Sequence, residues 1–441
     1  MHPVFQEIIE IARNKFEQAF GQEPEAQPQE AWDPDAWEEE VRQFTCQLGH
    51  LALERRAQKE AEKAQAQARF CPCGQRRHLR KRKAFWWSTT YGRVAVEDIY
   101  LVCPKGDSTA RPFAHRSGLR CRGKSKALRR VLSDFGAEKS FAKARKQLKE
   151  HYGVELPGES IRRVVEEEAR RVQGYLSQRW EEVVAEYQQG KRGRKGASWL
   201  IVESDGSMVR TGKLVPAPRG GLRKNGQPKR ERESAWREVR LSTVEVAGEA
   251  GRLYGAVLGS PEEVGRQMFA LALLAGWGEA SRVHGLGDGA LWIAPLIQGV
   301  FPGSGYLLDR YHLLEHLYLG AQGLPKGYPL SAREWVEEQV SQIDQGGVEE
   351  VVTCCQSLGG DGENPLGDLA RYLHNQREHL DYAAAREQGL PVGSGAVEGG
   401  HRHVIQERLK LPGTWWKEEN VNPMLALRTL RANGWWEAFW N

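Results

Sequence analysis

Three acidic residues in the second half of the sequence stand where they could share one piece of chemistry. Asp205 follows the apolar run "WLIV", Asp288 follows "RVHGLG", and Glu398 lies between glycines in "PVGSGAVEGGHRHVIQERLK". Carboxylates brought close together repel strongly unless a cation neutralises them. Their hard oxygen atoms suit Mg2+ or Mn2+. Two such ions ~3.5–4 Å apart can activate a nucleophile and stabilise a leaving oxygen in phosphodiester chemistry.

Each of these residues also has a plainer interpretation. Asp-Gly pairs, as in "SDGS" and "GDGA", are usually turns. A glutamate near a helix start is favoured by the helix dipole. The glycines around Glu398, Gly395 and Gly399 among them, leave room for a ligand to approach, but glycine is also common where a helix begins. The three carboxylates in this order are stronger evidence than any one of them.

Two further positions accompany the carboxylates. In "DRYH", Asp309 and His312 lie three residues apart where a strand becomes a helix, so they could share one face. Asp309 could instead cap that helix, and His312 could contact DNA or a metal-bound carboxylate. Arg402, one turn after Glu398, could bind a phosphate or pair with a carboxylate on its own helix.

The surrounding elements predict how the carboxylates are positioned. We expect a buried strand from Trp199 to Val202 that ends near Asp205, then two strands in "WREVRLSTVEVAG" and "GRLYGAVLG". A helix from Pro261 leads to a strand ending at Asp288, and a second helix leads to a strand ending at Asp309. The first three strands should be antiparallel and the last two parallel. This order predicts a ribonuclease H-like mixed α/β domain with a helical insertion before its last helix.

In that fold the strands of Asp205 and Asp288 are neighbours, so both carboxylates should meet beyond the strand ends. The chain as a whole is expected to be a multidomain α+β protein. The expected parts are a helical region (1–70), a small basic β/Cys module (71–124), helix-turn-helix-like helices (125–190), the first part of the catalytic core (197–329), the helical insertion (330–390), and the last core helix with a Trp-rich C-terminus (391–441).

Basic clusters indicate a polyanionic partner, although the net charge of the 441 residues is only +5. The clusters are "RRHLRKRK", "RSGLRCRGKSKALRR", "GKRGRKG" and "RKNGQPKRER". Two amphipathic helices around "YGVELPGES" are typical of a helix-turn-helix or of an ordinary helical hairpin. The candidate DNA-binding residues are Arg162, Arg163, Lys191, Arg192, Arg194, Lys195, Lys229 and Arg230.

The composition of the chain indicates in which cellular compartment we expect the protein. No apolar stretch approaches the ~20 residues of a membrane span. The N-terminal helix lacks the continuous apolar run of a signal peptide. Seven cysteines, an odd number, argue against a disulfide framework. We expect a cytoplasmic, nucleoid-associated protein.

Long motifs in a fixed order resemble one family. "VESDGSMVRTG", "GLGDGALWI", "LLDRYHLLEHL", "GSGAVEGGHRHVIQERLKLPGTWW" and "MLALRTLRANGWW" resemble Kra-type bacterial insertion-sequence transposases of the DDE class, which are related to the Mutator-like group. The resemblance implies cleavage of double-stranded DNA at the element's terminal inverted repeats, strand transfer into target DNA, and a dimer or higher oligomer on DNA. It also implies that Asp205, Asp288 and Glu398 hold two Mg2+ or Mn2+ ions.

One feature departs from the family. Relatives carry paired Cys-x-x-Cys knuckles, whereas this chain has "CPCG" and a single cysteine in "VCPKGD". Cys71, Cys73, Cys103 and Cys121 could still bind Zn2+, or the module could be a small basic β-element without metal. Two other functions remain open for the whole chain: a ribonuclease H-like nuclease without strand transfer, and a catalytically inactive, sequence-specific DNA-binding protein.

Overall fold

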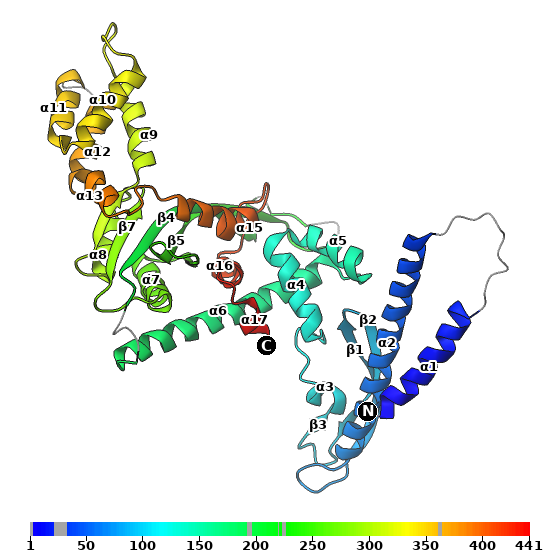
Figure 1. The fold of residues 1–441 in the computed structure, drawn as a ribbon. Helices are drawn as coiled ribbons and strands as arrows, with labels where there is room; N and C mark the ends of the chain where they lie inside the picture. Colours follow the sequence, from blue (N-terminus) through cyan, green and yellow to red (C-terminus); the bar gives the residue numbers. More distant parts are fainter. Residues whose placement is uncertain (1–2, 22–32, 192–195, 219, 223–225, 360–363) are drawn as a thin grey trace. The chain divides into compact units, whose positions relative to one another are not determined.

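The computed structural model describes residues 3–21, 33–191, 196–218, 220–222, 226–359 and 364–441. The chain divides into two compact units, Met1–Glu168 and Ala169–Asn441, with the boundary inside the long helix α6 (Gly158–Gln188). Each unit contains its own β-sheet (Figure 1). The prediction of a mixed, multidomain α+β chain is confirmed.

The first unit packs helices against a three-stranded antiparallel sheet in the order β1-β2-β3. Its elements are α1 (Pro3–Phe20), α2 (Pro34–Gln67), β1 (His78–Thr89), β2 (Gly92–Val102), β3 (Thr109–Ala110), α3 (Pro112–Arg116), α4 (Lys126–Glu138) and α5 (Phe141–Tyr152). The turn between β1 and β2 falls at Gly92, whose φ of 101° suits glycine. Alanines of α2 and valines of β2 form the small core.

Local signals set the helix ends that precede α6. The Ser125 and Ser140 side chains accept from backbone N–H groups in the first turns of α4 and α5. Helix α5 ends at Gly153, where φ is 64°, and α6 starts directly after Pro157. The helix, break and second helix around "YGVELPGES" therefore occur as predicted.

The second unit is built on a five-stranded mixed sheet in the order β6-β5-β4-β7-β8 (Figure 1). Its strands are β4 (Trp199–Pro216), β5 (Arg230–Val246), β6 (Arg252–Val257), β7 (Arg282–Gly287) and β8 (Gly305–Leu308). Strands β4, β5 and β6 pair antiparallel, whereas β7 and β8 join parallel to β4. The predicted meander and the two parallel additions are confirmed.

One strand boundary was predicted wrongly. Strand β4 does not end near Asp205 but continues to Pro216, because β5 pairs with it from Leu200–Val246 to Pro216–Arg230. Gly206 takes its place in that ladder opposite Arg240 instead of forming a turn. Hydrogen bonds from a long partner strand override the local tendency of an Asp-Gly pair.

The two faces of the sheet are covered by different elements. Leu200 and Val202 of β4 point to the face covered by α7 (Pro261–Ala275) and α8 (Ile293–Val300). Because side chains alternate along a strand, Ile201, Glu203 and Asp205 point to the other face. That face carries α14 (Gly395–Gly400), which packs on β4 and β5.

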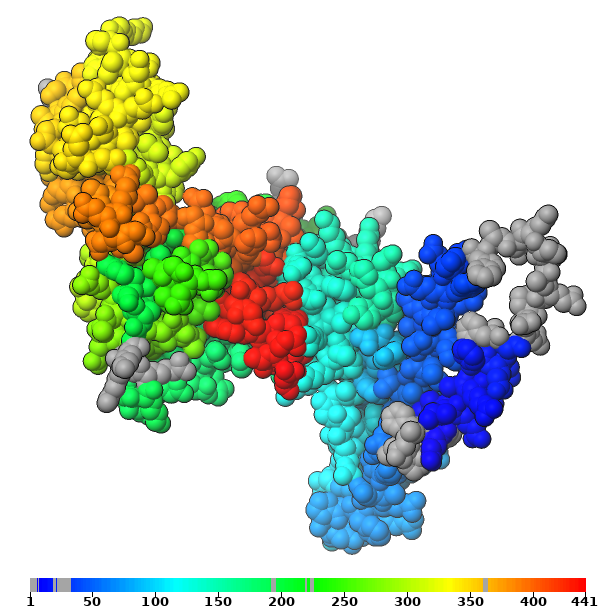
Figure 2. All heavy atoms as spheres, in the orientation of Figure 1, coloured from blue at the N-terminus to red at the C-terminus, as the bar shows by residue number. Residues whose placement is uncertain are grey.

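The remaining helices of the second unit form the helical insertion and the C-terminal region. They are α9 (Arg310–Ala321), α10 (Ala332–Asp344), α11 (Val348–Gly359), α12 (Pro365–Gln376), α13 (Tyr382–Glu387), a π-helical stretch (His401–Gln406), α15 (Glu407–Leu409), α16 (Val421–Ala432) and α17 (Trp436–Trp440). Residues of α10 to α12 share a buried core centred on Trp335. In the space-filling view they gather as one lobe, coloured yellow to orange (Figure 2).

Among the described residues, no helix is both long enough and apolar enough to cross a membrane.

Candidate active site

Asp205 and Asp288 occupy equivalent positions on two adjacent parallel strands. Strand β4 pairs with β7 up to Glu203–Leu286, and each aspartate lies two residues beyond that pair. Asp205 shares the face of Glu203 on β4, because side chains two residues apart on a strand share a face. Asp288 lies one residue past the end of β7, and its carboxyl group interacts with that of Asp205. The predicted convergence of Asp205 and Asp288 therefore has a geometric basis in the strand register.

The electrostatics of the two aspartates are unequal. Burial raises the pKa of Asp288, and the neighbouring Asp205 carboxylate adds to the rise. Burial also raises the pKa of Asp205, but contact with His401 outweighs it, and the pKa lies below the ordinary value. The pair thus holds a surplus of negative charge in a partly buried place, where a cation would be stabilised.

His401 is a member of this site that sequence reasoning missed. Its Nε2 atom lies 2.8 Å from Asp205 Oδ2, and the residue is only 4% exposed. In the described structure neither of its ring nitrogens makes an aligned hydrogen bond. The contact with Asp205 is therefore at hydrogen-bonding distance but without hydrogen-bond alignment. The spacing from Glu398, three residues on a helix, was the signal that could have indicated it.

Glu398 lies on the helix packed across the same face, as predicted, but it is exposed. In the described residues its carboxylate makes no hydrogen bond or ion pair with Asp205 or Asp288. The three carboxylates also do not fall within the 4.8 Å that would let them hold one ion together as they stand. Asp205 therefore contacts His401 and interacts with Asp288. Glu398 lies one helical turn before His401 and contacts neither aspartate in the described structure.

The glycines beside Glu398 differ in their surroundings. A Cβ atom added at Gly395 or Gly399 would meet nothing within 4 Å. At Gly400 it would lie 2.8 Å from Leu241 Cδ2 and 3.0 Å from Tyr254 Cε1. Gly400 is therefore needed for close packing of the helix on β5 and β6, whereas Gly395 and Gly399 face space that no side chain of the described chain occupies.

Alanine substitutions should separate these two kinds of glycine. Gly399→Ala is expected to raise the free energy of unfolding by about 0.5–1 kcal/mol, because alanine is the better helix former. Gly400→Ala is expected to lower it by about 1–3 kcal/mol through overpacking. Urea unfolding of both variants measures the difference. Equal stability of the two would contradict the close packing at Gly400.

Two buried carboxylates hold the start of α14. Asp309 caps α9 through Oδ1, which accepts from the Tyr311 and His312 N–H groups at 2.6 and 3.0 Å. Its Oδ2 accepts from the backbone N–H and the hydroxyl of Ser394. Oε2 of the second carboxylate, Glu203, accepts from the Val397 N–H at 2.6 Å. We call Glu203 and Asp309 the carboxylate clamp.

Glu203 was not singled out from the sequence, although it stands two residues before Asp205 in "VESD". It is 2% exposed, and burial raises its pKa to about 7. Asp309 is 1% exposed, and its carboxylate accepts four hydrogen bonds from the protein. The helix-capping alternative for Asp309 is therefore the one that the structure displays.

His312 is half-buried, and Arg402 is exposed. His312 Nδ1 lies 3.3 Å from Glu315 Oε2, and its charge would lower the pKa of both Asp205 and Asp288. Arg402 Nε lies 3.8 Å from Glu407 Oε1, and its side chain is 75% exposed. The ion-pair partner of Arg402 is therefore Glu407 and not Glu398.

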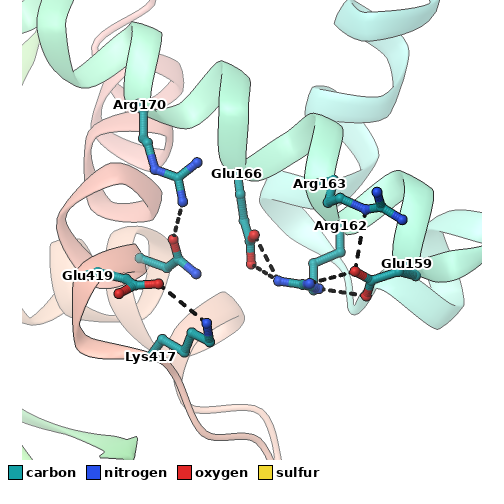
Figure 3. A network of polar contacts seen from close by, with 8 residues as sticks. Glu159, Arg162, Arg163, Glu166, Arg170, Lys417 and Glu419 are labelled. Atoms are coloured by element: carbon teal, nitrogen blue, oxygen red, sulfur yellow. Dashed lines mark hydrogen bonds and ion pairs between the residues drawn. The ribbon is translucent and has the colours of Figure 1, made fainter. Parts of the chain in front are cut away.

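The candidate DNA-binding residues fall into three groups. Arg162 and Arg163 form ion pairs on α6, with Glu159 and Glu166 as the acceptors (Figure 3). Arg170, which is not one of these candidates, lies further along α6 and donates to Asn420 Oδ1 at 2.8 Å (Figure 3). Lys191, Lys229 and Arg230 are exposed. Arg192, Arg194 and Lys195 lie outside the described residues. Arg162 and Arg163 would therefore have to exchange a carboxylate for a phosphate on binding DNA.

Only part of the predicted cysteine set comes together. The ligand atoms of Cys71, Cys73, Cys103 and Asp107 all lie within 4.8 Å of one another. Cys121 lies elsewhere, with its Sγ 3.6 Å from Glu168 Oε1. Asp107 was not considered as a ligand, although it stands in the quoted "VCPKGD".

Comparisons with known proteins cover part of the chain. Residues 279–438 match UPF0236, an uncharacterised protein family. A UPF0236 protein in the vanSb 3′ region of Streptococcus gallolyticus is 27% identical over 146 residues, which are 33% of this chain and 31% of that protein. The match thus spans about a third of the relative's length. The family match over residues 279–438 includes Asp288, Glu398 and His401 but begins after Asp205.

A solved structure is also similar over most of the chain. The Drosophila P element transposase strand transfer complex matches 73% of this chain and 82% of its own chain, at 10% identity and a TM-score of 0.22. A score this low carries no weight for a shared fold or function.

Proposed function

We propose that this protein is a DDE-class DNA transposase of the Kra-type, Mutator-related group. It would cleave DNA at the ends of an insertion sequence and transfer the strands into target DNA. The observation that carries the proposal is the pair Asp205 and Asp288, in register on adjacent parallel strands, beneath the helix that bears Glu398 and His401.

The strand order supports a ribonuclease H-like catalytic domain. Three antiparallel strands followed by two parallel ones, in the order β6-β5-β4-β7-β8, have the arrangement expected of that fold. The helices α10–α13 lie before the helix that bears Glu398, in the place where the order of elements in the sequence predicts a helical insertion. The sites of open α/β sheets lie beyond the strand ends, where Asp288 follows β7. Asp205 lies at the equivalent place within β4, two residues past the last β4–β7 pair.

The donor set fits divalent Mg2+ or Mn2+. Asp205 and Asp288 offer hard oxygen atoms at the site of surplus negative charge, and Glu398 would complete the set from α14. Bound ions would supply a stronger nucleophile and neutralise the charge of the leaving oxygen. His401 orients the Asp205 carboxylate from its buried side, and the carboxylate clamp fixes the helix that carries both His401 and Glu398.

Double-stranded DNA is the proposed partner. Lys191, Lys229 and Arg230 are exposed cations that suit phosphate contacts. Pairing two element ends would need at least a dimer on DNA. A salt dependence of binding should accompany such contacts, since each neutralised phosphate releases counterions.

The experiment that tests the function uses a supercoiled plasmid carrying the gene's own flanking DNA. Purified protein is added with Mg2+ or Mn2+, and every break is mapped, with EDTA as the control. Metal-dependent breaks confined to the flanks, with joined products, support the transposase. Scattered metal-dependent breaks would replace the proposal by a nuclease without strand transfer. Tight binding of the flanks without any break would replace it by a DNA-binding protein that does not cut.

A further inference from the structure

Two loops of the first unit fold into the same turn and face each other. The sequences are "CPCG" at Cys71 and "CPKG" at Cys103. In each, the cysteine carbonyl accepts from the glycine N–H at 2.9 Å, and the glycine has a positive φ, 82° at Gly74 and 78° at Gly106. Each cysteine N–H also donates a hydrogen bond to a carbonyl later in the chain, Cys71 to that of Gln75 and Cys103 to that of Ser108.

The turns bring four ligand side chains together. Cys73 Sγ lies 3.6 Å from Cys103 Sγ, the spacing of two thiols that could share a tetrahedral ion, and all seven cysteines are free. Cys71 and Cys103 are buried, whereas Cys73 and Asp107 are exposed. Cys71 Sγ also lies 3.1 Å from the Ser108 hydroxyl oxygen, next to the second turn.

From this geometry we propose that Cys71, Cys73, Cys103 and Asp107 hold one structural Zn2+ ion, with Asp107 in place of a fourth cysteine. The first turn supplies two thiolates. The second supplies one thiolate and, one residue after its glycine, a carboxylate. On binding, the thiol protons pass to the solvent. Cys121 takes no part, because it stands at φ 49° beside Glu168.

The ion would stabilise the fold of this module by joining the two turns. Cys71 follows the end of α2, and Cys103 follows β2, so the two knuckles come from segments far apart in the sequence. Apart from those turns, the core of this module is small, with two alanines, two valines and a phenylalanine buried. Small modules of this kind commonly need a metal or a disulfide to stay folded. The proposal does not depend on the transposase assignment.

The test measures zinc on the full chain purified under reducing conditions. We expect one zinc per chain by elemental analysis in the wild type and in Cys121→Ser. In Asp107→Ala we expect at least a tenfold weaker affinity, measured by competition with a chromophoric chelator. Cobalt-substituted wild type should show the absorption of a tetrahedral three-thiolate site, and Asp107→Cys should bind tightly and shift it toward that of four thiolates.

Three results would overturn the proposal. One is zinc that is lost in Cys121→Ser and kept in Asp107→Ala. Another is a wild-type chain without zinc that also binds no Co2+. The last is a Cys73–Cys103 disulfide in protein kept free of reductant, with no metal taken up after reduction. Because the tight-binding Asp107→Cys variant restores a ligand, a merely unfolded Asp107→Ala would not be mistaken for loss of the site.

Discussion

Asp288→Asn is expected to abolish metal-dependent DNA cleavage while leaving DNA binding within about twofold of the wild type. Asparagine keeps the size of the side chain and can still accept from the Ala290 N–H, which Asp288 Oδ1 does at 2.9 Å. It cannot hold a divalent cation as a carboxylate does. Metal-based charge stabilisation is worth several kcal/mol, so the cleavage rate should fall on the order of a thousandfold or more.

The Asp288→Asn variant should lose activity but not free energy of unfolding. The folded-state pKa of Asp288 is raised, so folded protein binds more protons than unfolded protein between the two pKa values, and stability falls as pH rises through that window. At neutral pH in EDTA the charged carboxylate therefore costs stability, and Asn removes that cost. Urea unfolding should show Asp288→Asn at least as stable as the wild type.

A matched control distinguishes the site from a general effect of charge. Asp368→Asn makes the same chemical change at a side chain that is 71% exposed in the helical insertion. It should leave cleavage unchanged, and Asp205→Asn should behave like Asp288→Asn. Cleavage by Asp288→Asn at near the wild-type rate would remove the two aspartates from the proposed mechanism.

Glu203→Ala is expected to lower metal affinity and cleavage by about 10–100-fold, although Glu203 need touch neither metal nor DNA. The change leaves the buried Val397 N–H without its acceptor and frees the start of α14. Losing such a partner costs about 1–3 kcal/mol. Groups that orient metal ligands from behind commonly have effects of this size. Calorimetric Mn2+ titration and the plasmid assay measure both losses.

Glu203→Gln is the conservative partner of that variant. Its amide oxygen can still accept from Val397, so cleavage should return to within a few fold of the wild type. The Glu203 pKa of about 7 lies above its ordinary 4.5, so wild-type stability in EDTA should fall as pH rises from 4.5 to 7. The Gln variant lacks that loss and should be the more stable of the two at pH 8. If Gln were as damaging as Ala, Glu203 would act by its charge and not by position.

The sequence by itself determined the order of the strands and helices around the candidate site. Apolar runs of strand length, separated by helical periodicity, indicated a three-strand meander followed by two parallel strands, and the pairing agrees. Those signals are local, because burial repeats every two residues on a strand and about every 3.6 on a helix. Asp205 and Asp288 could be placed near each other because their strands are neighbours in the ribonuclease H-like fold that the element order predicted, and β4 does pair with β7.

Only the tertiary structure decided which polar groups meet across the chain. Glu203 and Val397 are 194 residues apart, and no local pattern reports such a contact. The same holds for His401 beside Asp205, and for Asp107 beside Cys71 while Cys121 stands apart. The length of β4 likewise depended on a partner strand. Local propensity acts through neighbouring residues, whereas these contacts are set by packing of distant segments, whose gain in free energy outweighs local preference.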